Sequence, residues 1–426
     1  MSLLDEYKWR GLFYDATDGA ARAFATEPRV AYIGFDPTAS SLHVGSLLPI
    51  MGLVHLQRAG HTPVALVGGG TGLIGDPSEK AAERALLSRE EAEANAAGIH
   101  AQLAHFLDFE VKGNPARMAN NLDWLGKVGM VDFLRDVGKH FSINALLGKD
   151  SIRRRVQDPQ ASISFTEFSY VLLQAYDFLE LYDRLGCTVQ MGGSDQWGNI
   201  TAGTELIRRV RGARAYGVTF PLLTTSSGTK FGKTESGTVW LDPARTTPYR
   251  FYQFWMNTPD ADAGAYLRLF TLFSREEVEE LEASTAAEPH RRIAQKALAA
   301  DVTRRLHGED GLGRARKASE VLFGGEIEGL DAGEISDIFA DVPSSRIPRG
   351  ALQGEGLALV DLLHGAGLAA SKSDARRAIS GGGIYVNNHR VADVSARVTA
   401  DQAVEGEIVV LRRGKKRYHL VRPADQ

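Results

Sequence analysis

Short apolar runs alternate with segments of helical periodicity through the first half of the chain. Residues 29–35 and 63–67 are continuous apolar runs of strand length, and a polar or glycine-rich turn follows each of them. Residues 88–109 repeat Ala, Leu and Phe at helical spacing, and Ser88 with Glu91 three residues later is typical of a capped helix start. This alternation predicts an α/β domain with a Rossmann-like parallel sheet covered by helices on both faces.

The same patterns divide the rest of the chain into three further parts. The α/β domain is expected over residues 1–246, and residues 247–323, with spaced Leu, Phe and Arg, predict a helical domain. Residues 324–356 are dense in Gly and Pro and are expected to act mainly as a connector. Residues 357–426 predict a small α+β module with a basic helix, a glycine stop and a strand with an Asn-Asn turn.

Composition is that of an ordinary globular protein. The chain has 426 residues, 43% hydrophobic and 24% charged, and no apolar run approaches the ~20 residues of a membrane span. The N-terminal MSLLDEYKWRGL has no apolar signal core, so we expect a cytoplasmic protein with no membrane partner. Cys187 is the only cysteine, which excludes an internal disulfide framework and a cysteine-rich zinc site.

Charge is unevenly distributed along the chain. The net charge is −4, yet residues 368–426 hold 11 Lys and Arg against 6 Asp and Glu. A basic end on an acidic body is typical of an attached RNA-contacting piece, although a solvated basic tail has the same composition.

The segment DPTASSLHVGS, residues 36–46, follows a predicted strand and leads into a helix expected over residues 44–59. Hydroxyl groups such as Thr38, the imidazole of His43 and the free N–H groups of the helix start can together bind an anion. The alternative is an ordinary helix cap formed by Ser41 beside a surface histidine.

The segment KFGKT, residues 230–234, places two lysines on a glycine-containing polar loop. Such a loop suits transient clamping of pyrophosphate charge. An exposed hairpin is the alternative for any loop so rich in Gly, Ser and Thr.

A glycine pattern in the turn after residue 67 imitates a dinucleotide-binding fingerprint. Gly70, Gly72 and Gly75 have its spacing, but the fingerprint requires a helix to begin within the motif. Because Asp76 and Pro77 follow instead, a turn that lets the backbone approach a substrate is favoured over a dehydrogenase.

Two further segments carry polar groups into apolar surroundings. In the helix predicted from residue 165, Tyr170, Gln174 and Asp177 lie on one side, either as a structural hydrogen-bond network or as the wall of a pocket. A buried aspartate of this kind needs a partner. Residues 190–203 form a second glycine-rich loop, in which Asp195 can accept two ribose hydroxyls.

Residues 36–46 and 230–234 together resemble the HIGH and KMSKS signatures of class I aminoacyl-tRNA synthetases, and the sequence between them resembles the bacterial tyrosyl-tRNA synthetases. The likeness covers essentially the whole chain. Two departures stand out: Ser46 replaces the second histidine of the first signature, and KFGKT differs from KMSKS at three of five places, although tyrosyl enzymes commonly carry it. A serine can still donate a hydrogen bond to a ribose oxygen.

The resemblance implies a tyrosine–tRNA ligase that uses ATP with Mg²⁺ and binds L-tyrosine and tRNA(Tyr). It also implies a homodimer formed through an insertion at about residues 110–160, an anticodon-side helical domain, a C-terminal RNA-binding module and no metal site in the protein itself.

The resemblance also assigns roles to individual residues. Catalysis is expected from Thr38, His43, Ser46, Lys230 and Lys233. ATP is expected to contact these residues together with Gly34, Asp36, Gly45, Gly193, Asp195, Phe231, Gly232 and Thr234. Tyrosine is expected to contact Tyr32, Asp76, Tyr170, Gln174, Asp177, Gln190 and Gln196, with Tyr32 and Asp177 at its phenol hydroxyl. Contacts to tRNA are expected from Lys372, Arg376, Arg377, Arg412, Arg413, Lys415, Lys416 and Arg417.

Two alternatives remain at this point. A tryptophanyl relative would share the fold but would not need Asp177 at a phenol. A non-catalytic RNA-binding protein that kept the fold is the other, and the two N-terminal signatures argue against it.

Overall fold

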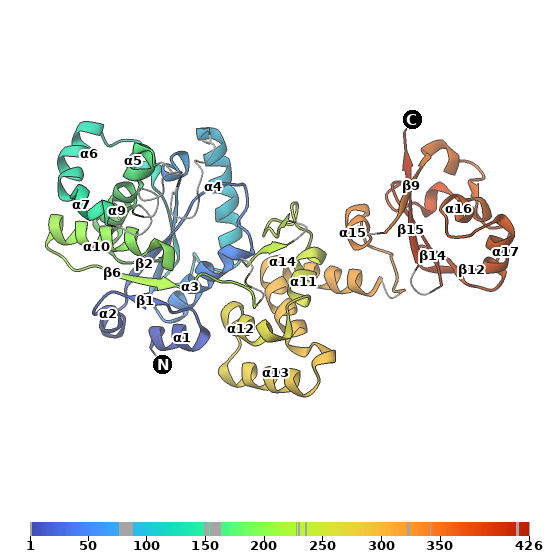
Figure 1. Ribbon diagram of the computed structural model, residues 1–426, viewed down its shortest axis with the longest axis horizontal. Coiled ribbons are helices and arrows are strands. Elements are labelled where there is room, and N and C mark those ends of the chain that lie inside the picture. Colours follow the sequence, from blue (N-terminus) through green and yellow to red (C-terminus); the bar gives the residue numbers. More distant parts are fainter. Residues whose placement is uncertain are drawn as a thin grey trace. The chain divides into compact units, whose positions relative to one another are not determined.

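A computed structural model describes residues 2–75, 88–148, 153, 163–226, 228, 231–234, 237–321, 324–340, 342–414 and 417–425. Within these ranges only the backbone is described for Arg89, Ala145, Lys233 and Thr234. The chain forms two compact units, the first made of residues 1–242 and 258–298 and the second of residues 243–257 and 299–426 (Figure 1).

The first unit is built around a six-stranded sheet of order β1-β6-β5-β2-β3-β4. Its strands are β1 (Asp15–Ala16), β2 (Val30–Phe35), β3 (Thr62–Val67), β4 (Arg117–Asn120), β5 (Cys187–Gly193) and β6 (Tyr216–Phe220). All neighbours pair in parallel except the edge strand β1, so the predicted parallel sheet is confirmed. Strand β2 lies between β3 and β5, and the order reverses there, which is where open parallel sheets bind ligands at the carboxyl ends of their strands.

The described part of the first unit also contains helices. They are α1 (Leu3–Arg10), α2 (Ala20–Thr26), α3 (Leu47–Arg58), α4 (Arg89–Leu103), α5 (Leu122–Leu125), α6 (Met130–Asp136), α7 (Ile143–Leu147), α9 (Phe165–Leu185), α10 (Trp197–Arg211), α12 (Asp260–Phe270) and α13 (Arg275–Ala287). No helix among the described residues is both long enough and apolar enough to cross a membrane.

Two predicted helices differ at their ends from the observed ones. The helix expected over residues 44–59 starts as a 3-10 turn at Val44–Ser46 before α3 begins. The helix expected over 88–109 has its predicted Ser88–Glu91 capping box, but α4 ends at Leu103. Beyond that point Asp108 accepts hydrogen bonds from two following backbone N–H groups, and a local turn of this kind competes with helix.

The second unit combines helices with a five-stranded sheet of order β12-β11-β14-β15-β9. Its helices are α11 (Pro248–Met256), the part of α14 (Ile293–Val321) from residue 299 on, α15 (Ala332–Ile338), α16 (Leu359–Gly365) and α17 (Lys372–Ser380). The strands of the second unit as a whole are β9 (Ser344–Pro348), β10 (Leu357–Ala358), β11 (Ile384–Val386), β12 (His389–Val391), β13 (Arg397–Val398), β14 (Val409–Arg413) and β15 (Arg417–Ala424). The Asn-Asn turn between β11 and β12 is confirmed, since Asn387 and Asn388 have φ of 48° and 63°, as a tight hairpin requires.

The predicted domain limits need correction in this part of the chain. Strand β9 lies inside the expected connector 324–356, yet it pairs in parallel with β15 and completes the C-terminal sheet. Helix α15 is likewise packed, because Ile335 and Phe339 share a core with Val410 and Leu420. The helices expected as one domain over 247–323 are divided between the two units.

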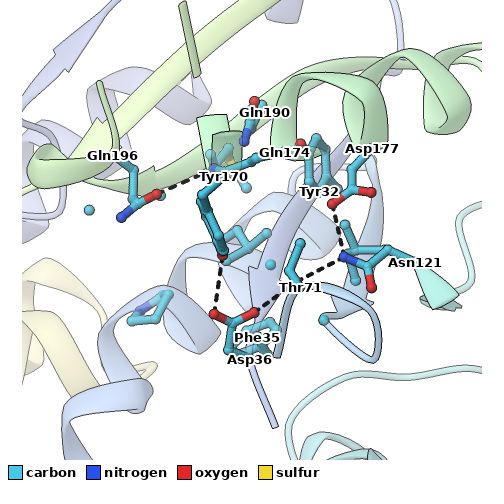
Figure 2. A pocket seen from close by; sticks show the side chains of 18 of the residues that line it. Tyr32, Phe35, Asp36, Thr71, Asn121, Tyr170, Gln174, Asp177, Gln190 and Gln196 are labelled. Carbon is cyan, nitrogen blue, oxygen red and sulfur yellow. Dashed lines mark hydrogen bonds between the residues drawn. The ribbon is translucent and has the colours of Figure 1, made fainter. Parts of the chain in front are cut away.

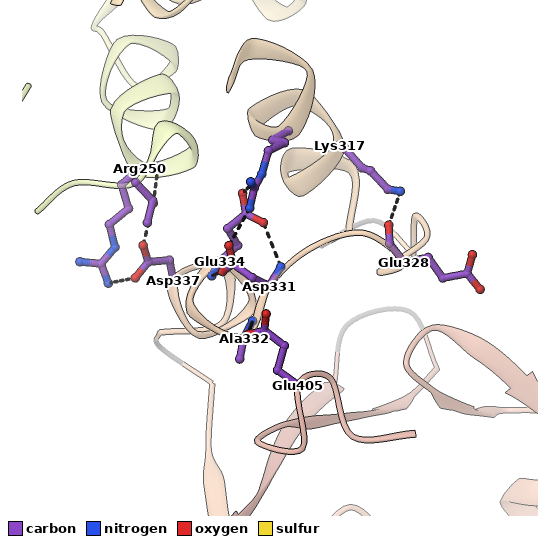
Figure 3. A network of polar contacts seen from close by, with 10 residues as sticks. Arg250, Lys317, Glu328, Asp331, Ala332, Glu334, Asp337 and Glu405 are labelled. Carbon is purple, nitrogen blue, oxygen red and sulfur yellow. Dashed lines mark hydrogen bonds and ion pairs between the residues drawn. The ribbon is translucent and has the colours of Figure 1, made fainter. Parts of the chain in front are cut away.

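A polar network adds to the packing of α15 (Figure 3). Arg314 on α14 bonds to Asp331 at 2.6 Å and to the buried Glu334 at 2.8 Å. At the other end of α15, Asp337 accepts a hydrogen bond from Thr247 at 2.7 Å. The segment before β9 is therefore held by ion pairs and apolar contacts, which its Gly and Pro content did not indicate.

Candidate active site

A cavity of about 220 Å³ lies at the carboxyl ends of β2 and β5, with α9 along one side (Figure 2). We call it the inner pocket. It is lined by Tyr32, Ile33, Gly34, Phe35, Asp36, Pro49, Leu66, Gly68, Thr71, Asn121, Tyr170, Gln174, Asp177, Gln190, Met191, Gly192, Gly193, Asp195 and Gln196. The structure thus brings together the three predicted residues of α9 with Tyr32, Gln190 and Gln196, which come from distant segments. Asp76 lies outside the described residues.

One end of the inner pocket is formed by Asp177 and Tyr32. Asp177 is 2% exposed, and its two carboxylate oxygens accept hydrogen bonds from Asn121 Nδ2 at 2.9 Å and Trp124 Nε1 at 2.7 Å. Burial raises the pKa of Asp177 to about 7, although both of these hydrogen bonds act in the opposite direction.

Tyr32 contributes the second polar group at this end. Its hydroxyl is buried and has no hydrogen-bond partner among the described residues, and burial raises the pKa of Tyr32 well above its ordinary value. Because buried polar groups are nearly always hydrogen-bonded, this end can accommodate a ligand group that both donates and accepts, such as a hydroxyl.

The other end of the inner pocket is a network around Asp36. Tyr170 Oη and Thr71 Oγ1 donate to the two carboxylate oxygens of Asp36, each at 3.1 Å. Gly68 is confined beside this network, since an added Cβ would lie 2.2 Å from Asp36 Oδ1. An acceptor surrounded by hydroxyl and amide groups suits a cationic ammonium. Asp36, which the resemblance assigned to ATP, therefore also forms part of this end.

The amides of Gln174, Gln196 and Asn199 form a third polar group. Gln174 Nε2 donates to Gln196 Oε1 at 3.3 Å, and Asn199 Nδ2 donates to both glutamines at 3.0 Å. Asp195, expected at the ribose of ATP, lines the inner pocket and accepts a hydrogen bond from Gln196 at 2.8 Å.

A wider cavity of about 770 Å³ adjoins the inner pocket and shares with it Gly34, Phe35, Asp36, Pro49 and Gly193. We call it the outer cavity. Thr38, His43, Gly45 and other residues up to Leu48 line one part of it, and Phe231, Gly232 and other residues between Phe220 and Trp240 line another, so the two signature segments meet in one site. Among the predicted residues it contains Thr38, His43, Gly45, Ser46, Phe231 and Gly232.

His43 has a defined orientation in the outer cavity. Its Nδ1 accepts a hydrogen bond from the backbone N–H of Gly45 at 3.0 Å, and its ring lies edge-on to Trp240. Accepting at Nδ1 places the proton of the neutral ring on Nε2. Nε2 can therefore donate a hydrogen bond to an anion.

The first signature segment is joined by backbone hydrogen bonds to the residues that follow KFGKT, and it also lies beside Gly232 of KFGKT itself. Val44 N donates to Val239 O at 3.0 Å, and Leu241 N donates to Leu42 O at 2.9 Å. Gly232 has a φ of +85°, and an added Cβ would lie 2.9 Å from Val44 Cγ2. A glycine is required there for both reasons.

The lysines of KFGKT are only partly described. Lys230 lies outside the described residues, and for Lys233 and Thr234 the structure gives the backbone alone. These two residues form β7, which pairs with β8 (Gly237–Thr238). The segment is thus a hairpin, which was the alternative to a phosphate-binding loop in the sequence analysis. It also borders the outer cavity through Phe231 and Gly232.

Sequence reasoning missed three residues that hold the inner pocket: Thr71, Asn121 and Trp124. Asn121 links the two ends, because its Nδ2 contacts both Thr71 Oγ1 and Asp177 Oδ2 at 2.9 Å. A polar residue after a strand was the available signal, but β4 is the unremarkable sequence RMAN. Trp124 carried no signal, since its contact with Asp177 spans 53 residues.

The basic residues predicted for RNA are of two kinds. Arg412 is 8% exposed, with its guanidinium 3.7 Å from the Tyr385 ring centre, and Arg413 bonds to both carboxylate oxygens of Asp374. Arg413 lowers the pKa of Asp374 to about 2. These two arginines are thus engaged within the module and are not simple surface contacts. The exposed ones are Lys372, Arg376, Arg377 and Arg417, whereas Lys415 and Lys416 lie outside the described residues.

Fold and site together define an α/β protein that places a small polar pocket beside a larger cavity bordered by the two signature segments. The family description "tRNA synthetases class I (W and Y)" matches residues 25–324, and "Tyrosine--tRNA ligase SYY-like C-terminal domain" matches residues 334–421. The chain belongs to this family of class I tRNA synthetases.

Individual relatives agree over the full length. The chain is 57% identical over 421 residues to the tyrosine–tRNA ligase of Roseiflexus castenholzii, covering 99% of each chain. It is 54% identical over 427 residues to that of Geobacillus stearothermophilus, covering 100% of each. A C-terminally truncated mitochondrial tyrosyl-tRNA synthetase of Aspergillus nidulans matches with a TM-score of 0.69 and 31% identity, covering 76% of this chain and 94% of that one.

Proposed function

We propose that the chain is a tyrosine–tRNA ligase. It activates L-tyrosine with ATP to tyrosyl-adenylate and pyrophosphate, and it then transfers the tyrosyl group to the terminal ribose of tRNA(Tyr). The observation that carries the choice of amino acid is the Asp177–Tyr32 end of the inner pocket. A phenol hydroxyl can donate to Asp177 and accept from Tyr32, whereas the indole N–H of tryptophan can only donate.

The two cavities suit the two substrates of the first step. A tyrosine with its phenol at Asp177 and its ammonium near Asp36 and Tyr170 would direct its carboxylate toward the shared wall at Gly34 and Gly193. The ATP α-phosphate would then be approached from the outer cavity. No side chain needs to act as a nucleophile, because the tyrosine carboxylate attacks the phosphate directly.

Catalysis then consists of positioning and of stabilising charge that develops on the phosphates. His43 and Thr38 line the outer cavity, and we expect Lys230 and Lys233 of KFGKT to act with them on the phosphates. We expect Mg²⁺ to enter with ATP, since phosphate oxygens and water are its usual ligands.

For the second step we propose that the C-terminal module contacts tRNA. The exposed residues Lys372, Arg376, Arg377 and Arg417 support this role, and such contacts to phosphate weaken as salt rises. The affinity of the full chain for tRNA should therefore fall steeply as the salt concentration rises. When these four residues are replaced by alanine, the affinity should depend less steeply on salt.

We also propose a homodimer. Exposed apolar side chains on three helices support it: Met130 and Val131 on α6 and Phe165 at the start of α9 are 74%, 76% and 75% exposed, and Leu134 on α6 and Ile143 and Leu147 on α7 are exposed as well. Clusters of exposed apolar side chains mark protein contacts. Sedimentation should give a dimer that Phe165→Asp weakens. Action in the cytoplasm remains a prediction from the sequence.

ATP–pyrophosphate exchange with each of the twenty amino acids tests the proposal. Tyrosine alone should support rapid exchange. Equal exchange with tryptophan would favour the tryptophanyl alternative, and no exchange with any amino acid would favour the non-catalytic RNA-binding protein.

A further inference from the structure

Helix α12 contacts the loop that leads from β6 into KFGKT at two separate places. The first is polar: the backbone N–H and the hydroxyl of Ser226 both donate to Asp262 Oδ2, at 3.2 and 3.0 Å. Asp262 is 9% exposed and lies in the first turn of α12. Neither residue lines the inner pocket or the outer cavity, so the contact supports the loop and does not touch a substrate.

The second contact is aromatic. Phe231, the second residue of KFGKT, is 6% exposed and stacks on Phe270 with ring centres 5.2 Å apart and planes at 14°. It also meets Tyr266 edge-on at 5.1 Å. Aromatic contacts of this geometry stabilise a packed loop beyond the area that they bury. Phe231, assigned to ATP by resemblance, therefore also anchors its own loop.

The contacts on α12 form one stripe. Asp262, Tyr266 and Phe270 are four residues apart in succession, so they lie above one another on a single face of the helix. The C-terminal end of α12 is fixed as well, because the buried Arg10 of α1 donates to the carbonyl oxygens of Arg268 and Thr271, both at 2.9 Å. The stripe is thus part of a helix held at its far end.

A backbone hydrogen bond also joins the second anchor to the residues that follow β6. Phe231 N donates to Leu223 O at 3.2 Å. The next residue is Gly232, which packs against Val44 and Gly45 of the first signature. A shift at the α12 stripe would therefore move the residues on either side of Gly232, where both lysines lie in the sequence.

We propose that Asp262, Tyr266 and Phe270 are positioning residues for adenylate formation, which hold the lysine-bearing loop against the HVGS segment. The proposal rests on the proposed function, since it concerns the step in which pyrophosphate leaves. Misplacement by about 1 Å of a group that stabilises the transition state can lower a rate by as much as about 10²-fold. Loss of one of the two anchoring contacts should lower the rate of adenylate formation by less than this, about 10-fold.

The test compares variants of the full-length protein in single-turnover adenylate formation. Asp262→Ala and Phe270→Leu should each slow the step by about 10-fold, with the tyrosine dissociation constant unchanged within about 2-fold. Asp262→Asn should retain most of the rate, because its amide oxygen can still accept from Ser226. Asp260→Ala is the matched control: it removes a neighbouring carboxylate of the same helix turn, whose partner is Gln295 at 2.6 Å, and it should leave the rate within about 2-fold.

A double-mutant cycle separates positioning from general destabilisation. If the stripe acts through the loop lysines, Asp262→Ala should add little further loss in a Lys233→Ala background. Full additivity, or near-wild-type rates for both Asp262→Ala and Phe270→Leu, would overturn the proposal. A wild-type protein that fails to exchange pyrophosphate with tyrosine would instead overturn the proposed function. Should Asp262→Ala not fold, Phe270→Leu with Lys233→Ala provides the same cycle.

Discussion

The inner pocket and the outer cavity share a wall but are built in different ways. In the inner pocket Asp36, Thr71, Asn121 and Asp177 form a continuous hydrogen-bonded chain. The outer cavity is bordered by two loops that come from segments nearly 200 residues apart and meet through glycines and backbone hydrogen bonds. We therefore expect amino-acid recognition to depend on side chains that hold one another in place, whereas phosphate chemistry depends on how two loops are brought together.

The largest expected effect is at the recognition end of the inner pocket. The kcat/KM for activation of phenylalanine should be lower than that for tyrosine by on the order of 10²- to 10⁴-fold, because the two hydrogen bonds lost at Asp177 and Tyr32 cost about 1–3 kcal/mol each. Exchange assays with both amino acids measure the ratio. Tyr32→Phe should reduce it, whereas Tyr170→Phe, which removes a hydroxyl at the opposite end, should lower both activities and leave the ratio unchanged. Comparable activation of both amino acids by the wild type would show that this end has been wrongly assigned.

A second effect concerns the phosphate side. His43→Ala or Lys233→Ala should slow adenylate formation by on the order of 10²- to 10³-fold, as for loss of one donor to developing charge, while tyrosine binding changes little. Rapid-quench experiments measure the rate of adenylate formation, and equilibrium dialysis measures the binding of tyrosine. Parallel losses in rate and tyrosine binding would mean that the two cavities are not separable in the way proposed here.

A third effect tests the junction of the two loops. Gly232→Ala should lower the rate of adenylate formation by about 10-fold, because an alanine at φ +85° is strained by about 1–2 kcal/mol and its Cβ would contact Val44. Gly60→Ala is the matched control, since its φ is +87° and nothing lies within 4 Å of the added Cβ. Gly60→Ala should lower the melting temperature and leave the rate of adenylate formation unchanged. Equal rate loss in both variants would assign the effect to stability and not to the junction.

The smallest effect is a pH dependence of tyrosine binding. With a pKa of about 7, raised by burial, Asp177 is protonated below pH 7 and ionised above it. Only the ionised form accepts from the phenol while both oxygens also accept from Asn121 and Trp124, so the KM for tyrosine should rise several-fold from pH 8 to pH 6. Asp177→Asn should bind weakly with no such slope. A slope that persists in Asp177→Asn would locate the titrating group elsewhere.

Local features of the sequence were predicted well where the cause is itself local. Buried apolar runs gave β2 and β3 to within one residue, and the Ser88–Glu91 pair gave the start of α4. The four- and three-residue spacing of Tyr170, Gln174 and Asp177 placed them on one face of α9, and the inner pocket lies on that face. Helical spacing, caps and turn residues act within a few residues of one another, so they can be recognised before anything is known of the fold.

Features that depend on pairing between distant segments were not predicted. Strand β9 has only five residues and contains a proline, and it becomes a strand because β15 offers it an edge more than 70 residues later. Arg412 and Arg413 look in the sequence like RNA contacts, but Tyr385 and Asp374 engage them inside the module. Charge and composition alone do not distinguish a solvated arginine from one that packs within a domain.

By itself the sequence determined the parallel sheet, the two signature segments and the set of polar residues of α9, together with the resemblance that names their chemistry. Tertiary structure alone decided that Asn121 and Trp124 hold Asp177, that Asp36 lies at one end of the inner pocket and also in the wall of the outer cavity, and that α12 contacts the KFGKT loop. The physical reason is that the free energy of a buried hydrogen bond or aromatic contact depends on a partner brought near by the fold, and no spacing along the chain encodes that partner.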